Sequence, residues 1–442
     1  MKNRPKVIVI DDDPTGSQTV HSCLLLTRWD VENLRLGLED QAPIFFILSN
    51  TRAMTPEQAR AVTVEVCQNL KKAIAQSGVQ DFLVVSRSDS TLRGHYPVET
   101  DAIAEILGPF DAHFLVPAFF EGGRFTRDSI HYLVVNGTPT PVHETEFAKD
   151  SVFAYDHSYL PDYVAQKTQG RIPAAAVTRF LLPDIRSGLQ NRLSQLTNNQ
   201  CCVVDAETQD DLNQFAADLL AAAAKGKRFL FRSAASLLTA LAALPPQPIA
   251  AAEMSRYTKG AGVVLVGSHV KKTTEQLNCL LQEPNVVGVE IDISHLLEDS
   301  PAQRQSILDQ TLERVAAIHQ AAQTPVVYTS RQELTFDDIQ ARLQFGAVVS
   351  ALLMDVVRGL PSDIGFLLSK GGITSNDVLS VGLELRSSRI VGQILAGCSV
   401  VITPPQHPRF PDLPVVLFPG NVGDVQALAT VYRRLTRADY ST

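Results

Sequence analysis

The sequence VIVIDDDPTGSQT, residues 7–19, changes character abruptly in its middle. Residues 7–10 are all β-branched and uncharged, which is typical of a strand buried on both faces. Residues 11–13 are all aspartate, and a turn follows in which Pro14 fixes the backbone and Gly16 frees it. Ligands of open α/β sheets bind beyond the carboxyl ends of the strands, so this junction predicts a site. A solvated acidic turn is the alternative.

The composition, 45% hydrophobic and 19% charged residues, is that of a soluble globular protein. A chain of 442 residues exceeds one ordinary core and predicts two or three domains. The net charge of -8 argues against a nucleic-acid partner, and no apolar stretch approaches a membrane span. The N-terminal apolar run is too short for a signal peptide, so we expect a cytoplasmic protein. Six scattered cysteines without CxxC spacing predict buried free thiols.

Strand-like and helix-like segments alternate along the first half of the chain. Each apolar run ends in polar or charged residues, and each return is helical, which predicts a parallel sheet with right-handed crossovers. A Thr-Pro-Glu-Gln sequence at residues 55–58 predicts a capped helix start. The expected strands after the first are residues 43–48, 81–86, 112–117, 200–204 and 228–233, and the expected helices are 55–77, 97–107 and about 208–225.

Residues 118–184 break this alternation. Residues 121–126 are expected to form a loop, and residues 131–137 a short strand and turn. Irregular excursions of this length are usually functional, so we expect an insertion that covers the substrate.

Three prolines within residues 244–248 predict a linker between domains of residues 1–244 and 249–442. Beyond it the alternation starts again. The expected strands are residues 262–266, 286–291, 325–329 and 363–369, with a further apolar run near 391–402. The expected helices are residues 273–281, 302–323, 336–358 and 425–437. The predicted fold class is α/β, with two domains that are each a mostly parallel sheet flanked by helices.

Three glycine-containing turns follow strands in the second half. Residues 370–375, KGGITS, come after a strand and open a helix, so backbone amides there could hold an anion and Thr374 could cap the helix. Residues 419–423, PGNVG, and 267–269, GSH, are similar strand-end turns. They predict a phosphate site, with simple chain turns as the alternative. Neither common nucleotide-binding motif, the P-loop or G-x-G-x-x-G, is present.

Acids and arginines gather just past strand ends in the first half. Guanidinium groups pair bidentately with carboxylates and an aspartate can accept a hydroxyl proton, so this set suits a small carboxylated, hydroxylated ligand. Surface salt bridges among loop residues are the alternative. The residues are Asp12, Arg52, Arg87, Asp89, Arg93 and His95.

Four of these stretches together resemble the four-carbon acid sugar kinase family, long catalogued only as a domain of unknown function. They are DDDPTG at residues 11–16, DSTLRG at 89–94, GGIT at 371–374 and PGNVG at 419–423. The resemblance runs in order along essentially the whole chain. It implies an N-terminal domain that binds acid sugars such as threonate, erythronate or 3-oxo-tetronate, and a C-terminal domain that binds ATP.

The resemblance also implies site residues. The acid sugar would be held by Asp12, Arg52, Arg87, Ser88, Asp89, Ser90 and Arg93, and the nucleotide by Ser268, Gly371, Gly372, Ile373, Thr374 and Gly420. The family often has a lysine near residues 87–88 and an asparagine where His95 stands. Arginine and lysine are not equivalent at a bidentate site, so the particular acid sugar stays open.

The resulting interpretation is an ATP- and Mg²⁺-dependent kinase that phosphorylates a terminal hydroxyl of a small acid sugar in a cleft between the domains. Asp12 is the first candidate for the base that takes the hydroxyl proton, and Asp89 the second. The metal ligands are not assigned. Small-molecule acid sugar and ATP are the expected partners, and a homo-oligomer stays open.

Two other functions are alternatives to the kinase. A phosphatase of the haloacid-dehalogenase type would use Asp11 as nucleophile and Asp13 as acid, and Thr15 follows them. Such an enzyme would not need three anion-binding loops in a second domain. A two-domain solute-binding protein is the other rival, and the lack of an export signal counts against it.

Overall fold

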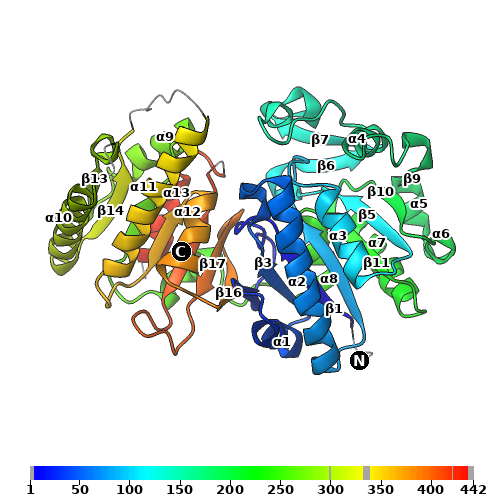
Figure 1. The fold of residues 1–442 in the computed structure, drawn as a ribbon, viewed down its shortest axis with the longest axis horizontal. Helices are drawn as coiled ribbons and strands as arrows, with labels where there is room; N and C mark the ends of the chain where they lie inside the picture. The colour runs from blue at the N-terminus through cyan, green and yellow to red at the C-terminus, as the bar shows by residue number, and fades with distance from the viewer. Residues whose placement is uncertain (1–3, 298–299, 332–338, 421, 437–442) are drawn as a thin grey trace. The chain divides into compact units, whose positions relative to one another are not determined.

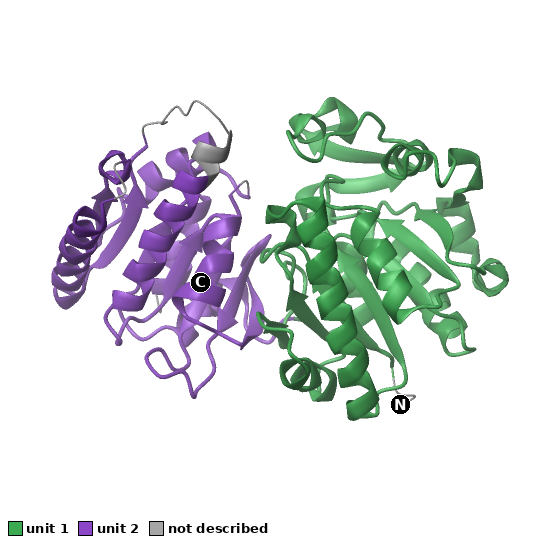
Figure 2. Cartoon of the chain, viewed as in Figure 1, with its two compact units in different colours: residues 1–246 green, residues 247–442 purple. Residues whose placement is uncertain are grey.

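The chain forms two compact units, residues 1–246 and residues 247–442 (Figure 2). The computed structural model describes residues 4–297, 300–331, 339–420 and 422–436. The boundary between the units falls inside the proline-rich stretch 244–248. Each unit is an α/β layer structure in which helices flank mostly parallel strands around a buried core, as the sequence predicted (Figure 1).

The first unit is built on a parallel sheet with β1 near its middle. β1 pairs with β3 on one side and β4 on the other, and residues 7–10 are buried as predicted. The strand order is β2-β3-β1-β4-β11-β5-β10-β9. The bounds are β1 Lys6–Asp11, β2 Cys23–Leu26, β3 Ile44–Leu48, β4 Phe82–Arg87, β5 Ala112–Val116, β9 Thr178–Phe180, β10 Gln200–Val204 and β11 Phe229–Ser233.

Helices flank this sheet, and their ends follow local sequence signals. The side chain of Thr55 accepts a hydrogen bond from the backbone of Gln58, and the side chain of Gln58 accepts one from the backbone of Thr55, so the predicted helix start is confirmed. The same helix ends at Gly78, whose φ of 72° suits glycine. The main helices are α1 Val31–Glu39, α2 Pro56–Ser77, α3 Val98–Leu107, α7 Gln209–Ala223 and α8 Ala235–Ala242.

Some segments of this unit differ from the sequence expectation. β2 and α1 were not predicted, because four apolar residues and a nine-residue helix give too little periodicity to stand out. The loop expected over residues 121–126 is wrong from Arg124 onward. That residue begins β6 Arg124–Arg127, which pairs with β7 Ile130–Val135, and β7 pairs with β8 Thr138–Pro141 in a separate antiparallel sheet.

The second unit repeats the parallel arrangement and adds antiparallel strands at one edge. Its order is β13-β14-β12-β15-β18-β17-β16, and the apolar run near 391–402 contributes to the antiparallel pair β16 and β17. The strand bounds are β12 Val263–Val266, β13 Val286–Ile291, β14 Thr324–Thr329, β15 Leu367–Lys370, β16 Ser387–Leu395, β17 Cys398–Ile402 and β18 Pro414–Phe418.

The helices of the second unit lie where strand-to-strand returns require them. They are α9 Lys271–Leu280, α10 Pro301–Gln320, α11 Ile339–Gly359, α12 Gly372–Asp377 and α13 Ala427–Thr436. Helices expected to start at Phe336 and to end at Arg437 match α11 and α13, but these two residues lie outside the described residues. No described helix is long and apolar enough to cross a membrane.

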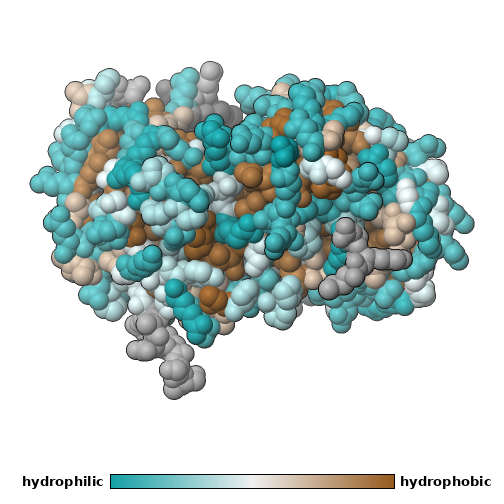
Figure 3. Space-filling model, turned by 90° about the horizontal axis from the view of Figure 1, so that it is seen from below, coloured by the Kyte–Doolittle hydropathy of each residue, from teal (hydrophilic) through white to brown (hydrophobic). Residues whose placement is uncertain are grey.

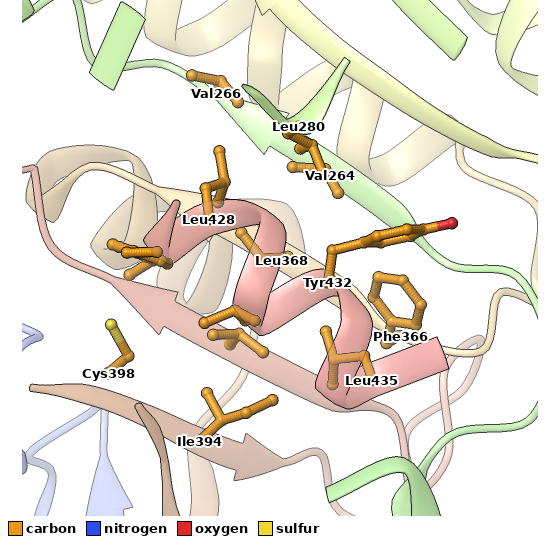
Figure 4. Packing of buried hydrophobic residues seen from close by; sticks show 14 of the residues in the cluster. Val264, Val266, Leu280, Phe366, Leu368, Ile394, Cys398, Leu428, Tyr432 and Leu435 are labelled. Atoms are coloured by element: carbon orange, nitrogen blue, oxygen red, sulfur yellow. The ribbon is translucent and has the colours of Figure 1, made fainter. Parts of the chain in front are cut away.

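The core of the second unit lies between the sheet and its helices. Leu428, Tyr432 and Leu435 of α13 pack with Phe366 and Leu368 in one buried cluster (Figure 4). Polar side chains cover much of the face drawn in Figure 3, with apolar residues between them. The six cysteines are all free, and five of them are buried, which confirms the expectation of buried thiols for all but half-buried Cys279.

Candidate active site

The carboxyl ends of β3, β1 and β4 bring the first set of site residues together. The register that pairs Asp11 with Arg87 places the acidic turn beside the loop after β4. Asp12 is 1% exposed, and its carboxylate accepts hydrogen bonds from Arg52 and, at 2.6 Å, from the hydroxyl of Ser88. The other terminal nitrogen of Arg52 lies 3.1 Å from Asp13. The predicted convergence of arginines and acids is therefore present.

Asp12 and Asp89 differ in proton affinity. Burial raises the pKa of Asp12, although Arg52 opposes the shift, and nearby Glu99 adds to it. The pKa of Asp89 lies below its usual range because its ion pair with Arg93, at 2.8 Å, and the nearby Arg52 outweigh the effect of burial. A carboxylate with a raised pKa is the better proton acceptor, so the directions of the two pKa shifts favour Asp12 over Asp89 as the base.

Asp11 is unsuited to be a phosphatase nucleophile. Its carboxyl group is fully buried and packs so closely on Gly16 that a Cβ there would overlap it. Burial raises its pKa to about 8, although Arg87, 3.5 Å away, opposes the shift. A carboxyl group that is mostly protonated at neutral pH is a poor nucleophile, which counts against the haloacid-dehalogenase alternative.

Arg232 and Glu99 belong to the same hydrogen-bond network as Asp12 and Ser88, and neither was predicted from the sequence. Arg232 on β11 donates hydrogen bonds to Ser88 Oγ at 2.7 Å and to Glu99 Oε2 at 2.5 Å. A Cβ on Gly94 would overlap both Ser88 and Arg232, so only glycine fits at this position of the loop. An arginine inside the apolar strand sequence FLFRS was the available signal.

The loop after β4 lines a pocket in the first unit. Its charged and hydroxyl-bearing lining residues include Ser88, Asp89, Arg93 and Arg232, which can donate to or accept from hydroxyl and carboxylate groups. Ser90 and His95 are buried elsewhere in the loop, and His95 Nε2 lies 3.0 Å from the carbonyl of Met54. The complete lining is Ser88, Asp89, Leu92, Arg93, Leu115, Pro117, Tyr163, Arg232 and Ser233.

In the second unit, the loops after β12, β15 and β18 meet because these strands are neighbours in the sheet. Gly371 has a φ of 121°, and a Cβ there would lie 3.2 Å from Ser268 Cβ. A Cβ on Gly420 would lie 3.6 Å from Ser268 Oγ. The predicted turns at Ser268, Gly371 and Gly420 therefore form one small cradle.

Residues 372–374 are placed differently from one another. Gly372 opens α12, Ile373 is exposed, and Thr374 is buried. The expectation that Thr374 caps the helix is wrong, because Gly371 is the N-cap residue and no side chain caps the helix. Thr374 instead packs on Gly267, where a Cβ would overlap its hydroxyl. Asn421 of the third turn lies outside the described residues.

Two cationic side chains at this cradle were not predicted. Arg331, just after β14, donates a hydrogen bond at 2.7 Å to the carbonyl of Ser268, while its buried Nη1 has no hydrogen-bond partner among the described residues. Lys370 is fully buried, and its Nζ donates to the carbonyls of Pro419 at 2.6 Å and Gly420 at 3.0 Å. Burial lowers the pKa of Lys370 to about 7.

Metal ligands remain unassigned. In the part of the chain that the structure describes, no group of three or more His, Cys, Asp or Glu side chains is arranged to hold a metal ion.

Comparison with known proteins gives the family. A model described as "Sugar-binding N-terminal domain" matches residues 7–241, and one described as "Nucleotide-binding C-terminal domain" matches residues 263–428. The chain belongs to the four-carbon acid sugar kinase family, which confirms the resemblance seen in the sequence motifs. It is thus a carbohydrate kinase.

Two curated relatives with modest sequence identity are also named as acid sugar kinases. A D-erythronate kinase of Heliobacterium modesticaldum is 24% identical over 468 residues, covering 96% of this chain and 95% of the relative. A D-threonate kinase of Bordetella bronchiseptica is 28% identical over 165 residues, covering 36% and 38%. Solved structures from Salmonella typhimurium LT2 (TM-score 0.71, 20% identity, 98% of both chains) and Haemophilus influenzae (TM-score 0.63, 18% identity, 97% of this chain and 100% of the other) share the fold.

Proposed function

We propose that this protein is an ATP-dependent kinase that phosphorylates a hydroxyl group of a four-carbon acid sugar such as threonate, erythronate or 3-oxo-tetronate. The observation that carries the proposal is the buried carboxylate of Asp12, fixed by Arg52 and by Ser88, a residue that also lines the pocket of the first unit. Asp12 would accept the proton of the attacking hydroxyl group, and its raised pKa suits that role. The two relatives named as acid sugar kinases support the substrate class.

The cradle of the second unit fits a nucleotide. Ser268, Gly420 and the turn of residues 371–374 would hold the phosphates. The buried Nη1 of Arg331 has no hydrogen-bond partner among the described residues, and an anion would satisfy it. In a kinase, bound ATP supplies the phosphoryl group and Mg²⁺ neutralises its charge.

Arg124 is our candidate for the residue that binds the substrate carboxylate. The terminal nitrogens of Arg52 are already engaged by Asp12 and Asp13, and Arg87 faces Asp11. Among the described residues, no carboxylate lies within 4.0 Å of the Arg124 guanidinium, and its buried Nε has no hydrogen-bond partner. Burial without such a partner lowers its pKa, and nearby Asp89 only partly offsets this.

Replacing Arg124 by lysine should raise the KM for the acid sugar. Lysine keeps the positive charge but cannot form the bidentate hydrogen bonds of a guanidinium group. Losing one charged hydrogen bond costs about 1.5–3 kcal/mol, which corresponds to roughly a ten- to hundredfold rise in KM. Steady-state kinetics with both substrates would measure it. Arg127→Lys on the same strand is the matched control, because Arg127 is exposed and pairs with Glu207. Equal turnover of the neutral polyol that lacks the carboxylate would contradict this assignment.

Replacing Arg331 by lysine should weaken nucleotide binding by about ten- to hundredfold, because the guanidinium donates to the Ser268 carbonyl and also presents a donor that no described residue accepts from. Calorimetric titration with ATP would measure the change, and titration with the acid sugar should be unaffected. The control is Arg314→Lys on the exposed face of α10. Unchanged nucleotide affinity would remove Arg331 from the site.

A substrate screen tests the proposed function itself. The purified protein is incubated with ATP, Mg²⁺ and a panel of four-carbon acid sugars, with ADP release as the readout, and separately with sugar phosphates, with phosphate release as the readout. We expect ADP release with at least one acid sugar. Turnover of sugar phosphates alone would instead support the phosphatase.

A further inference from the structure

Three side chains of the excursion 118–184 hold three consecutive carbonyl groups of the loop after β4. His131 Nε2 lies 2.8 Å from the carbonyl oxygen of Ser90. The hydroxyl of Tyr155 donates to the carbonyl of Thr91 at 2.7 Å, and the hydroxyl of Tyr163 donates to that of Leu92 at 2.8 Å. We call His131, Tyr155 and Tyr163 the carbonyl clamp. None of the three was predicted from the sequence.

The clamp residues are fixed as hydrogen-bond donors. All three are buried. A carbonyl oxygen only accepts, so Nε2 of His131 carries the proton, and Nδ1, which is 2.9 Å from Thr126 Oγ1, accepts from that hydroxyl. Burial lowers the pKa of His131 to about 4, which keeps the ring neutral at physiological pH. Burial raises the pKa of both tyrosines, so their hydroxyl groups stay protonated.

The loop needs an external support. Leu92 has a φ of 67°, in the left-handed region that a leucine rarely adopts, so its conformation is held by its surroundings. Leu92 also packs in a buried cluster with Tyr155 and Tyr163. The clamped residues directly follow Asp89, and Arg93 comes directly after them. A shift of the clamped backbone would therefore move both side chains at the pocket.

We propose that the carbonyl clamp is the positioning device of the acid-sugar site: the excursion 118–184 sets the geometry of Asp89 and Arg93 through His131, Tyr155 and Tyr163. This inference rests on the proposed function, because it takes the loop after β4 as part of the acid-sugar site. Tyr163 also lines the pocket, whereas Tyr155 does not. Tyr155 therefore separates a positioning effect from a direct contact.

The test compares Tyr155→Phe with Tyr132→Phe. Tyr155→Phe removes one hydroxyl group and leaves the ring, and Tyr132, on β7 of the same excursion, is the matched control outside the clamp. We expect Tyr155→Phe to raise the acid-sugar KM by about two- to tenfold, with the KM for ATP unchanged. The double variant Tyr155→Phe/Tyr163→Phe should show a larger rise. Tyr132→Phe should leave both constants unchanged.

Hydrogen exchange gives a second readout that needs no activity. Amide exchange of residues 88–96 should be faster in Tyr155→Phe than in the unsubstituted protein, while exchange of α7 stays the same. If acid-sugar KM and loop exchange both match the unsubstituted protein, the clamp does not position the loop, and the inference is overturned. Faster loop exchange in a protein that phosphorylates no acid sugar would support the clamp and reject the proposed function. If Tyr155→Phe fails to fold, the hydrogen-exchange comparison decides and is made with Tyr163→Phe, because the KM of that variant would also include the contact of Tyr163 with the pocket.

Discussion

Replacing Asp12 by asparagine is expected to lower the turnover number by about 10²–10⁴-fold, the usual effect of losing a general base. Asparagine keeps the shape of the side chain and one of its two oxygens, so it can still accept from Arg52 while its amide nitrogen faces the hydroxyl oxygen of Ser88, and the fold should survive. Nucleotide affinity should be unchanged, because the cradle lies in the other unit. Single-turnover kinetics with acid sugar and ATP would measure the rate of the chemical step.

The matched control is Asp11→Asn. Because burial raises the pKa of Asp11 to about 8, this carboxyl group is mostly protonated at neutral pH, and an amide there should change the rate much less. A phosphatase would show the reverse order, since Asp11 would be its nucleophile. Incubation with labelled donor followed by acid quench would trap a phospho-protein. A label on Asp11 would contradict the kinase mechanism.

Replacing Arg232 by methionine is expected to cost about 3–5 kcal/mol of unfolding free energy, because it leaves the carboxylate of Glu99 buried and unpaired. Acid-sugar turnover should fall as well, since Ser88 loses the donor that fixes its hydroxyl group beside Asp12. Urea denaturation and steady-state kinetics would measure the two effects separately.

The double variant Arg232→Met/Glu99→Gln distinguishes the two roles of this arginine. Removing the charge of Glu99 should recover much of the lost stability, because no unpaired charge then remains buried. Turnover should stay low, since the hydrogen bond to Ser88 is still missing. If stability and turnover recover together, the loss of activity was a folding effect and Arg232 has no separate role in the site.

The sequence predicts the parts of the site that depend on local pattern. The β-branched run before Asp11 and the capped helix at Thr55 are signals within a few residues of one another, and the structure confirms both elements. Since parallel strands share one carboxyl edge, the gathering of Asp12, Arg52 and Ser88 also follows from the pattern.

The missed residues depend on contacts between distant parts of the chain. Glu99 and Arg232 are 133 positions apart. In the sequence, Glu99 looks like an ordinary charged residue of a helix and Arg232 like one of a strand. Arg331 and Ser268 are separated by 63 positions and meet only because β14 is the neighbour of β12. No periodicity or spacing rule gives such pairs, since they are set by strand order.

The carbonyl clamp has a consequence for how the chain acquires its site. Its three hydrogen bonds span 41, 64 and 71 positions, so the loop that carries Asp89 is completed by residues made much later in synthesis. Long-range contacts of this kind form late, because the intervening chain must first be ordered. The strand β1 and its acidic turn can take shape earlier. The loop after β4 should therefore be among the last parts of the first unit to reach its native conformation.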